Sequence, residues 1–369
     1  MHFSPETLAS LPLDLGVIHC SPCAKIVVSD LHSSTSPVSD NTSYNSSIGM
    51  ADIAARLASL RSIVPALESA LNSFTSSSSN FRIVRTVNPT DVLPKTLYIL
   101  DSSFNPPSIA HLALATSALC NPSPSDARPH RLLLLFSTHN ADKAPSPAGF
   151  AQRLALMTVF AEDLSRKLLQ SSSSDNSTSH SISHSQDQLD SPSILIDIGL
   201  TKAPYYTDKS AAISAAQPNP YPSNPIHIHL VGYDTLTRFV AAKYYPNHNP
   251  PLSALAPFFA AGHKLRVMQR PSNPVDGSSS EYGTVEEQTA FLENLRNGGL
   301  EKEGFERAWA DQIDMVLGNE GTGVSSTRVR KATKEGDWDT VGRLCTDGVA
   351  GWVKEMGLYE EDARIAKMA

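Results

Sequence analysis

Short apolar runs without alternation are the feature that most limits how this 369-residue chain can fold. Leu97–Leu100 is apolar throughout, and Arg131–Phe136 is apolar after its first residue. A strand with one face in water alternates apolar and polar residues, so these runs predict strands covered on both faces of a parallel sheet. Helical patterns separate the strands through most of residues 80–360. The pattern predicts an α/β fold with a mainly parallel sheet and helices on both faces.

The other predicted elements follow the same alternation. Further strands are predicted at Phe81–Val87, as an edge strand, and at Ile194–Ile198, Ile226–Val231, Lys264–Gln269 and Ile313–Leu317. Helices are predicted at residues 109–119, 151–168, 235–242, 285–295, 327–334 and 349–355. The carboxyl ends of parallel strands share one edge of the sheet, so we expect the polar segments that follow them to meet there.

Composition along the chain predicts one catalytic domain with disordered segments. Residues 1–50 are broken by prolines and become rich in Ser, Thr and Asn, which predicts a mostly disordered segment. Residues 51–80 carry apolar positions at alternating spacings of three and four, which predicts an amphipathic helix. The domain itself is predicted over 81–360, with a disordered Ser-rich insertion at about 170–193.

Charge and cysteine content exclude several functional classes. The formal net charge of −7 argues against a general nucleic-acid binder. No apolar run reaches membrane-spanning length, so we expect no membrane association and a cytoplasmic or nuclear location. Cys20 and Cys23 lack a second ligand pair, and His227 and His229 lack a third ligand nearby, so no protein-bound metal is expected.

The first motif is a helix start that follows the Leu97–Leu100 strand. Residues 102–107 form a Ser/Asn/Pro turn, and Ser108 is a natural N-cap for the helix after it. His111 would lie in the first helical turn, beside backbone N–H groups that have no partner within the helix. Such a helix start attracts anions.

The second motif is a late helix start with a cationic first turn. Ser325, Ser326 and Thr327 precede Arg328, Val329, Arg330 and Lys331. Cations at a helix N-terminus oppose the helix dipole, so they favour a bound anion. Taken alone, the segment is also typical of a capped surface helix with solvated charges. A phosphate-binding loop of the G-x-x-x-x-G-K-S/T type is missing, and the glycines at 318, 321 and 323 have the wrong spacing for a dinucleotide fingerprint.

The two helix starts together resemble the nucleotidylyltransferase superfamily. In that superfamily a T/H-x-x-H turn after the first strand and a late I-S-S-T-x-x-R segment jointly hold a triphosphate. Ser102–Pro107 with His111 and Val324–Arg330 match these motifs here. The S-F-N-P-P form looks most like nicotinamide mononucleotide adenylyltransferases, and the Ser-rich insertions look like the divergent fungal branch of that family. The resemblance covers roughly residues 95–345 and implies a Rossmann-like fold.

The resemblance implies adenylyl transfer from ATP to nicotinamide mononucleotide, giving NAD and pyrophosphate by direct in-line attack on the α-phosphorus. It implies catalytic roles for His111, Arg328 and Lys143, and Mg²⁺ bound mainly to phosphate oxygens. The ATP-binding residues would be Ser103, Phe104, Ser108, His111, Gly232, Asp234, Ser325, Ser326, Thr327 and Arg328. The residues that bind nicotinamide or nicotinate mononucleotide would be Asn105, Lys143, Arg153, Tyr205, Tyr206 and Thr207.

Several residues depart from the family pattern. Ser102 stands before Ser-Phe where glycine is usual, and the acidic Asp101 precedes it. Ser108 replaces the first motif residue, and Ala110 is the small residue before His111. Asp101 could approach magnesium or ribose, or satisfy its own turn. Asp234 could contact nucleoside hydroxyls, or cap the helix that follows it. The tryptophan that usually stacks the pyridine ring is absent from its loop, where Tyr205 and Tyr206 stand.

Alternative functions therefore stay open. One is nucleotidylyl transfer to another phosphorylated acceptor, such as a phosphopantetheine or a pyrimidine-nucleotide-linked alcohol phosphate. Another is an ATP-binding or ATPase protein of quality control that keeps the triphosphate site. Class I aminoacyl-tRNA synthetases share the superfamily motifs, but the negative charge argues against them. The choice between nicotinamide and nicotinate, and the oligomeric state, are not determined by these motifs.

Overall fold

The computed structural model describes residues 41–138, 148–174, 195–270, 282–318 and 323–360, with side chains omitted at 41–50 and 171–174. The strands are β1 (Phe81–Val87), β2 (Thr96–Asp101), β3 (His130–Ser137), β4 (Ile196–Thr201), β5 (Ile226–Gly232), β6 (Lys264–Met268) and β7 (Ile313–Val316). The α-helices are α1 (Asn41–Ser76), α2 (Ile109–Cys120), α3 (Phe150–Ser174), α4 (Tyr206–Ser214), α5 (Tyr233–Phe239), α6 (Ala256–Ala260), α7 (Val285–Arg296), α8 (Ser326–Lys334), α9 (Trp338–Leu344) and α10 (Asp347–Glu355). Short 3₁₀ helices span Ala242–Tyr244, Pro251–Leu255, Glu301–Glu303 and Arg307–Gln312.

The strands form one seven-stranded sheet in the order β1-β4-β3-β2-β5-β6-β7. The neighbours from β4 to β7 in this order pair in parallel. β1, which was predicted as an edge strand, lies at the edge and pairs antiparallel with β4. The predicted α/β class with a mainly parallel sheet is confirmed. Successive strands run outward from β2 in one direction and from β5 in the other, so the strand order reverses between these two neighbours. In open α/β sheets, ligands bind outside the strand ends at such a reversal.

Both faces of the central strands are buried, which explains their continuous apolar sequence. Tyr98 and Leu100 join the apolar cluster that includes α1, α3 and the C-terminal helices. Leu97 and Ile99 point to the other face, where Ile213 of α4 covers them. A third cluster packs α5, α6 and α7 around β6 and β7. Alternate residues of one strand therefore pack into two different apolar layers, one on each face of the sheet.

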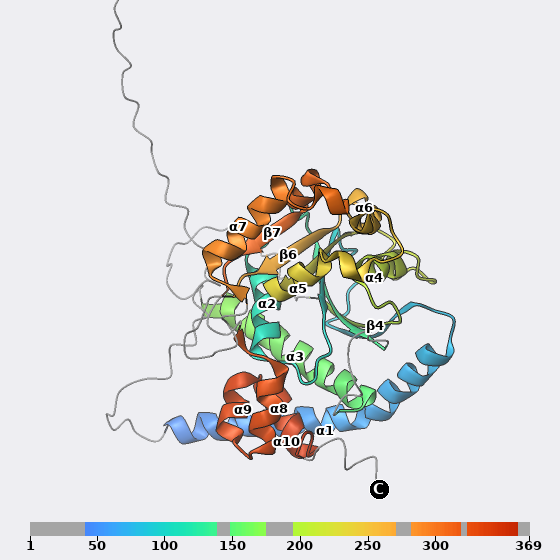
Figure 1. The fold of residues 1–369 in the computed structure, drawn as a ribbon. Helices are drawn as coiled ribbons and strands as arrows, with labels where there is room; N and C mark the ends of the chain where they lie inside the picture. The colour runs from blue at the N-terminus through green and yellow to red at the C-terminus, as the bar shows by residue number, and fades with distance from the viewer. Residues whose placement is uncertain (1–40, 139–147, 175–194, 271–281, 319–322, 361–369) are drawn as a thin grey trace, which may run out of the picture.

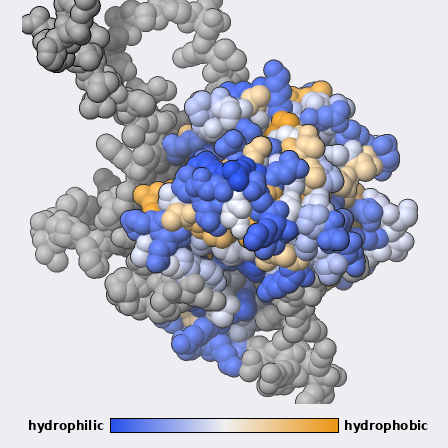
Figure 2. All heavy atoms as spheres, turned by 45° about the horizontal axis from the view of Figure 1, so that its top comes forward, coloured by the Kyte–Doolittle hydropathy of each residue, from blue (hydrophilic) through white to orange (hydrophobic). Residues whose placement is uncertain are grey.

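Helices also pack at the two ends of the view in Figure 1. α1 packs along α3 and α10 at the lower end of Figure 1, and α8 lies against α9 there. α6 and α7 lie at the opposite end of the view, near β6 and β7. Turned forward, this upper end is mainly hydrophilic, with hydrophobic residues singly or in small groups (Figure 2). Within the described ranges, no helix has the length and hydrophobicity that a membrane crossing requires.

Some boundaries differ from those predicted. α1 begins at Asn41 and ends at Ser76, so part of the segment predicted as disordered is helical. α3 extends to Ser174, so the first residues of the predicted insertion continue that helix. Residues 1–40 and 175–194 lie outside the described ranges. α6 and α9 were not predicted, because five- and seven-residue helices are too short for a periodic pattern to stand out.

Candidate active site

A cavity of about 990 Å³ opens at the carboxyl edge of the sheet, where the strand order reverses. Its wall is built from the ends of β2, β3, β5 and β6 and from residues of helices on both faces. Most of the predicted site residues line it, namely Ser103, Asn105, His111, Arg153, Tyr205, Tyr206, Gly232, Asp234, Ser325, Ser326 and Thr327. The fold thus brings residues from 103 to 327 into one space.

His111 is held in one orientation by the cap of α2. The backbone N–H of Ser108 donates to His111 Nδ1 at 3.0 Å. A backbone N–H can only donate, so Nδ1 accepts and the ring proton of the neutral form sits on Nε2. Nε2 then donates to Ser102 Oγ at 2.8 Å, on the cavity wall. The cap therefore presents an N–H donor to the cavity at the N-terminus of a helix.

The late motif contacts the first motif directly. Ser326 Oγ donates to the carbonyl oxygen of Pro106 at 2.7 Å. Arg330 Nη1 donates to the carbonyl oxygen of Asn105 at 2.8 Å, and its Nη2 donates to Thr327 Oγ1 at 3.0 Å. Segments more than two hundred residues apart in the chain thus form one continuous side of the cavity.

Arg330, rather than the predicted Arg328, is the arginine of α8 that lines the cavity. Ser326, Thr327 and Arg330 share a helix face because residues three and four apart are neighbours, and Arg328 lies on the exposed side. The arginine of the I-S-S-T-x-x-R pattern falls at position 330, so the sequence carried the signal that was missed.

Three other predicted residues, Phe104, Ser108 and Thr207, do not line the cavity. Phe104 is fully buried beneath His111, with 5.3 Å between the ring centroids, and Ser108 is buried with its hydroxyl 3.0 Å from His111 Nδ1. Both side chains contact the histidine. Thr207 is half-buried on α4, outside the cavity wall. Lys143 lies outside the described residues.

Arg153 is a fixed cation in the wall. Its Nε donates to the carbonyl oxygen of Ala148 at 3.1 Å, and its guanidinium lies 5.3 Å and 5.1 Å from the ring centroids of Phe136 and Phe150. Burial lowers the pKa of Arg153 to about 10, with Arg330 adding to the decrease. The group therefore stays protonated at neutral pH and offers a rigid positive charge.

Asp101 forms a buried ion pair with Lys209 of α4. The side chains are 8% and 6% exposed, and both residues line the cavity. Lys209 Nζ also lies 4.9 Å from the ring centroid of Tyr206. Neither predicted role for Asp101 anticipated this partner, because Lys209 comes from an element far away in the chain.

Gly232 and Asp234 form a second polar corner at the end of β5. Gly232 is the N-cap of α5, so Asp234 lies in the first turn and is not the cap. Its carboxylate accepts from Arg238 Nη2 at 2.7 Å. A Cβ on Gly232 would lie 2.7 Å from Asp234 Oδ1, so glycine leaves the carboxylate room at the cavity wall.

The charges on the wall suit a polyanion. Asp101 and Asp234 are paired with Lys209 and Arg238. Among the described residues, three further arginines on the wall have no carboxylate partner, namely Arg153, Arg270 and Arg330. The cavity therefore has an excess of positive charge, which favours phosphate groups.

The donor set does not form a metal cage within the described ranges, where no group of three His, Cys, Asp or Glu side chains could hold an ion. His227 and His229 are buried, and the ring of His227 stacks on His263 at 4.2 Å between centroids. Two paired carboxylates and a positive wall fit Mg²⁺ that arrives on phosphate oxygens.

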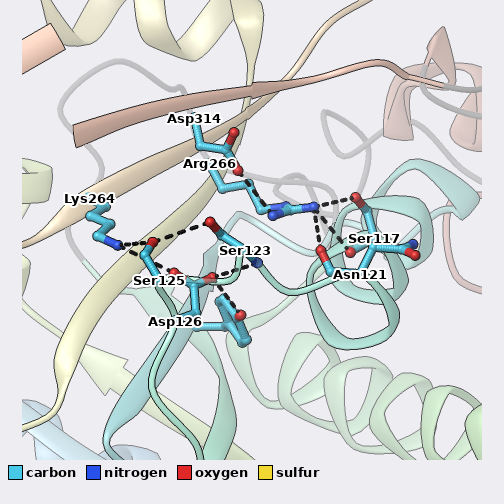
Figure 3. Close-up of polar contacts among 9 residues, drawn as sticks. Ser117, Asn121, Ser123, Ser125, Asp126, Lys264, Arg266 and Asp314 are labelled. Carbon is cyan, nitrogen blue, oxygen red and sulfur yellow. Dashed lines mark hydrogen bonds and ion pairs between the residues drawn. The ribbon is translucent and has the colours of Figure 1, made fainter. Parts of the chain in front are cut away.

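The C-terminal end of α2 is anchored by a side chain of β6 (Figure 3). Arg266 of β6 is buried, and its Nη2 donates to the carbonyl oxygens of Ser117 and Asn121 at 3.3 and 2.9 Å. Its Nη1 pairs with Asp314 Oδ2 at 3.1 Å. A neighbouring group joins Lys264, Ser125 and Asp126 (Figure 3). Arg266 thus satisfies carbonyl groups at the helix end, where cations are also favoured by the dipole.

The other side of the cavity is aromatic. Tyr205, Tyr206, Tyr244 and Tyr245 line it, and the rings of Tyr205 and Tyr245 lie 6.3 Å apart. Trp309 and Trp352 are buried elsewhere, as their positions in the sequence implied. The tyrosines provide the faces on which an aromatic base could stack.

A curated relative matches most of the chain. It is a Schizosaccharomyces pombe protein named "Putative nicotinamide mononucleotide adenylyltransferase", 29% identical over 295 residues, which cover 78% of this chain and 95% of that protein. The resemblance predicted from the two motifs is confirmed. The likeness to this relative extends well beyond the motifs, whereas no protein-family model matches the chain.

Two solved structures overlap more loosely. A Plasmodium falciparum nicotinic acid mononucleotide adenylyltransferase complexed with NaAD is 13% identical, covers 73% of this chain and 98% of its own, and has a TM-score of 0.41. Thermotoga maritima TmcAL bound with alpha-thio ATP is 14% identical, covers 71% and 55%, and has a TM-score of 0.29. At these sequence identities and TM-scores, the activities of the two proteins are not assigned to this chain.

Proposed function

We propose that the chain is a nucleotidyltransferase that transfers the adenylyl group of ATP to nicotinamide or nicotinate mononucleotide, releasing pyrophosphate. The observation that carries the proposal is the joining of the two motifs, in which Ser326 and Arg330 bind the backbone of the Asn105–Pro106 turn beside His111. The S. pombe relative, similar over most of both chains, supports the same reaction class.

On the phosphate-binding side, the proposal gives roles to His111, Thr327 and Arg330. His111 would donate from Nε2 to an α- or β-phosphate oxygen, exchanging Ser102 for the ligand. Thr327 and Arg330 would hold the outer phosphates, since the planar guanidinium binds two oxygens at once. These donors stabilise charge that develops on the α-phosphoryl group and the leaving pyrophosphate.

The acceptor would approach from the side of Arg153 and the tyrosines. Arg153 would fix the mononucleotide phosphate for in-line attack on the α-phosphorus, and Tyr205 or Tyr206 would stack the pyridine. Asp234 would accept from nucleoside hydroxyls. Mg²⁺ bound to the phosphates would supply further charge neutralisation. His111 would act as a hydrogen-bond donor, and no covalent enzyme intermediate is needed.

Chromatography of reaction products tests the proposal. The wild type is incubated with ATP, Mg²⁺ and either mononucleotide, and we expect dinucleotide and pyrophosphate in equal amounts. His111→Ala should lower turnover roughly a hundredfold or more, because it removes a donor to the reacting phosphates. His248→Ala, at an exposed histidine outside the cavity wall, should leave turnover unchanged.

Two other products would redirect the proposal. If neither mononucleotide gives a dinucleotide but another phosphorylated acceptor is adenylylated, the chain is an adenylyltransferase for a different class of acceptor. Slow ATP hydrolysis without any transfer product would instead favour an ATPase on the same fold. The departure of the pyridine site from the family pattern, with tyrosines in place of tryptophan, is the feature on which these outcomes depend.

A further inference from the structure

The Asp101–Lys209 pair stands at the end of β2 and faces the layer of α4. Asp101 continues the alternation of Leu97 and Ile99, whose side chains pack in the cluster that α4 covers. Lys209 lies near the start of α4 and meets the carboxylate across the cavity wall. With side chains 8% and 6% exposed, the two groups have little contact with bulk water.

The pair belongs to the aromatic side of the cavity. Lys209 Nζ lies 4.9 Å from the ring centroid of Tyr206, and Tyr205 immediately precedes it on the wall. The groups assigned to phosphates, His111, Arg153 and Arg330, come from α2, α3 and α8. Two of these helices, α2 and α3, pack on the opposite face of the sheet from α4. The pair therefore borders the space left for a pyridine ring.

The chemistry of the pair distinguishes the two pyridine substituents. An ionised Asp only accepts hydrogen bonds, and an ammonium only donates them. A carboxamide matches both groups, because its NH₂ donates to Asp101 and its carbonyl oxygen accepts from Lys209. A carboxylate matches only Lys209 and is repelled by Asp101, and this repulsion is strong where water is excluded.

We propose that the Asp101–Lys209 pair is a specificity determinant that favours an acceptor with a neutral carboxamide over one with a carboxylate. The inference rests on the proposed function and names the substrate within it. Because a carboxylate would leave Asp101 facing a like charge, the wild type should use nicotinamide mononucleotide roughly tenfold or more better than nicotinate mononucleotide.

The test is the ratio of kcat/KM for the two mononucleotides in two single variants. Asp101→Asn removes the repelling charge and leaves Lys209, so the ratio should shift roughly tenfold toward nicotinate. Lys209→Gln removes the attracting charge and leaves Asp101, so the ratio should shift further toward nicotinamide. A purely structural role would lower both rates together and would not move the ratio in opposite directions.

Controls separate folding from specificity. Asp208→Asn removes an exposed carboxylate from the same helix and should leave the ratio unchanged. If a single variant fails to fold, the double variant Asp101→Asn/Lys209→Gln leaves no unpaired charge, and its ratio should approach one. A wild type that prefers nicotinate, or ratios that stay constant across the variants, would overturn the inference alone. Absence of dinucleotide with both acceptors in the wild type would overturn the proposed function as well.

Discussion

Arg330 and Arg328 are two positions apart on α8 and face different surroundings. Arg330 lines the cavity and bonds to the carbonyl oxygen of Asn105, whereas Arg328 is on the exposed side of the helix. Both side chains are arginines on the first two turns of the same helix. Replacing each one in turn therefore distinguishes the effect of lining the cavity from the effect of a positive charge near the start of the helix.

At the residue scale, Arg330→Ala should reduce kcat/KM for ATP roughly a hundredfold, because it removes a bidentate donor to the outer phosphates. Arg328→Ala is the matched control and should change the value less than about threefold, as expected of a distant exposed charge. Steady-state kinetics with varied ATP measure both. Equal losses in the two variants would contradict the assignment of Arg330 to the triphosphate.

At the element scale, α2 is held at both ends. Ser108 and His111 close its N-terminal cap, and Arg266 binds its C-terminal carbonyl oxygens. The helix is only 12 residues long, so a shift at one end carries through to the other. The anchor on β6 thus contributes to the placement of His111, although it contacts the opposite end of the helix.

Arg266→Met should lower the free energy of unfolding by about 2–3 kcal/mol, because buried carbonyl groups lose their donors. Urea unfolding at neutral pH measures the change. Arg307→Met, which breaks an exposed pair with Glu301, is the control and should change the free energy of unfolding far less than Arg266→Met does. If the two variants are equally stable, Arg266 is not an anchor of α2.

At the scale of the whole molecule, three buried histidines around β5 connect stability to pH. Burial lowers the pKa of His227 to about 3 and of His263 to about 4, and it holds the pKa of His229 well below its ordinary value. His229 Nε2 and Ser210 Oγ lie 2.8 Å apart, joining β5 to α4. All three rings are therefore neutral in the folded protein at neutral pH.

The unfolded chain binds protons at these histidines near pH 6.5, whereas the folded chain does not until the pH approaches 4 or below. Stability is therefore complete above pH 7 and falls as the pH drops through 6 toward 4, by up to about 1.4 kcal/mol per pH unit for each histidine. Urea unfolding at several pH values measures the slope.

His263→Asn should reduce this slope by the contribution of one titrating group, because asparagine does not bind a proton in this pH range. The variant should still fold, since the amide oxygen can accept from the backbone N–H of His227. The control is His248→Asn, which replaces an exposed histidine. A slope that does not change in His263→Asn would show that this histidine is not kept neutral by the fold.

Most of the fold could be predicted from sequence because its cause is local. The runs at β2 and β3 are apolar at successive positions, and that pattern arises only where both faces of a strand are covered. The edge strand β1 was predicted as well. The start of α1 was not, because the Asn- and Ser-rich residues after Asn41 have no apolar period.

By itself, the sequence determined the α/β class, the two helix starts and the family resemblance, because strand burial, helix capping and motif spacing are all written in neighbouring residues. Only the tertiary structure decided that the two motifs meet, since Ser326 and Arg330 reach the Asn105–Pro106 turn from more than two hundred residues away in the chain. It likewise paired Asp101 with Lys209, because burial of two opposite charges requires elements that are distant in the chain to meet.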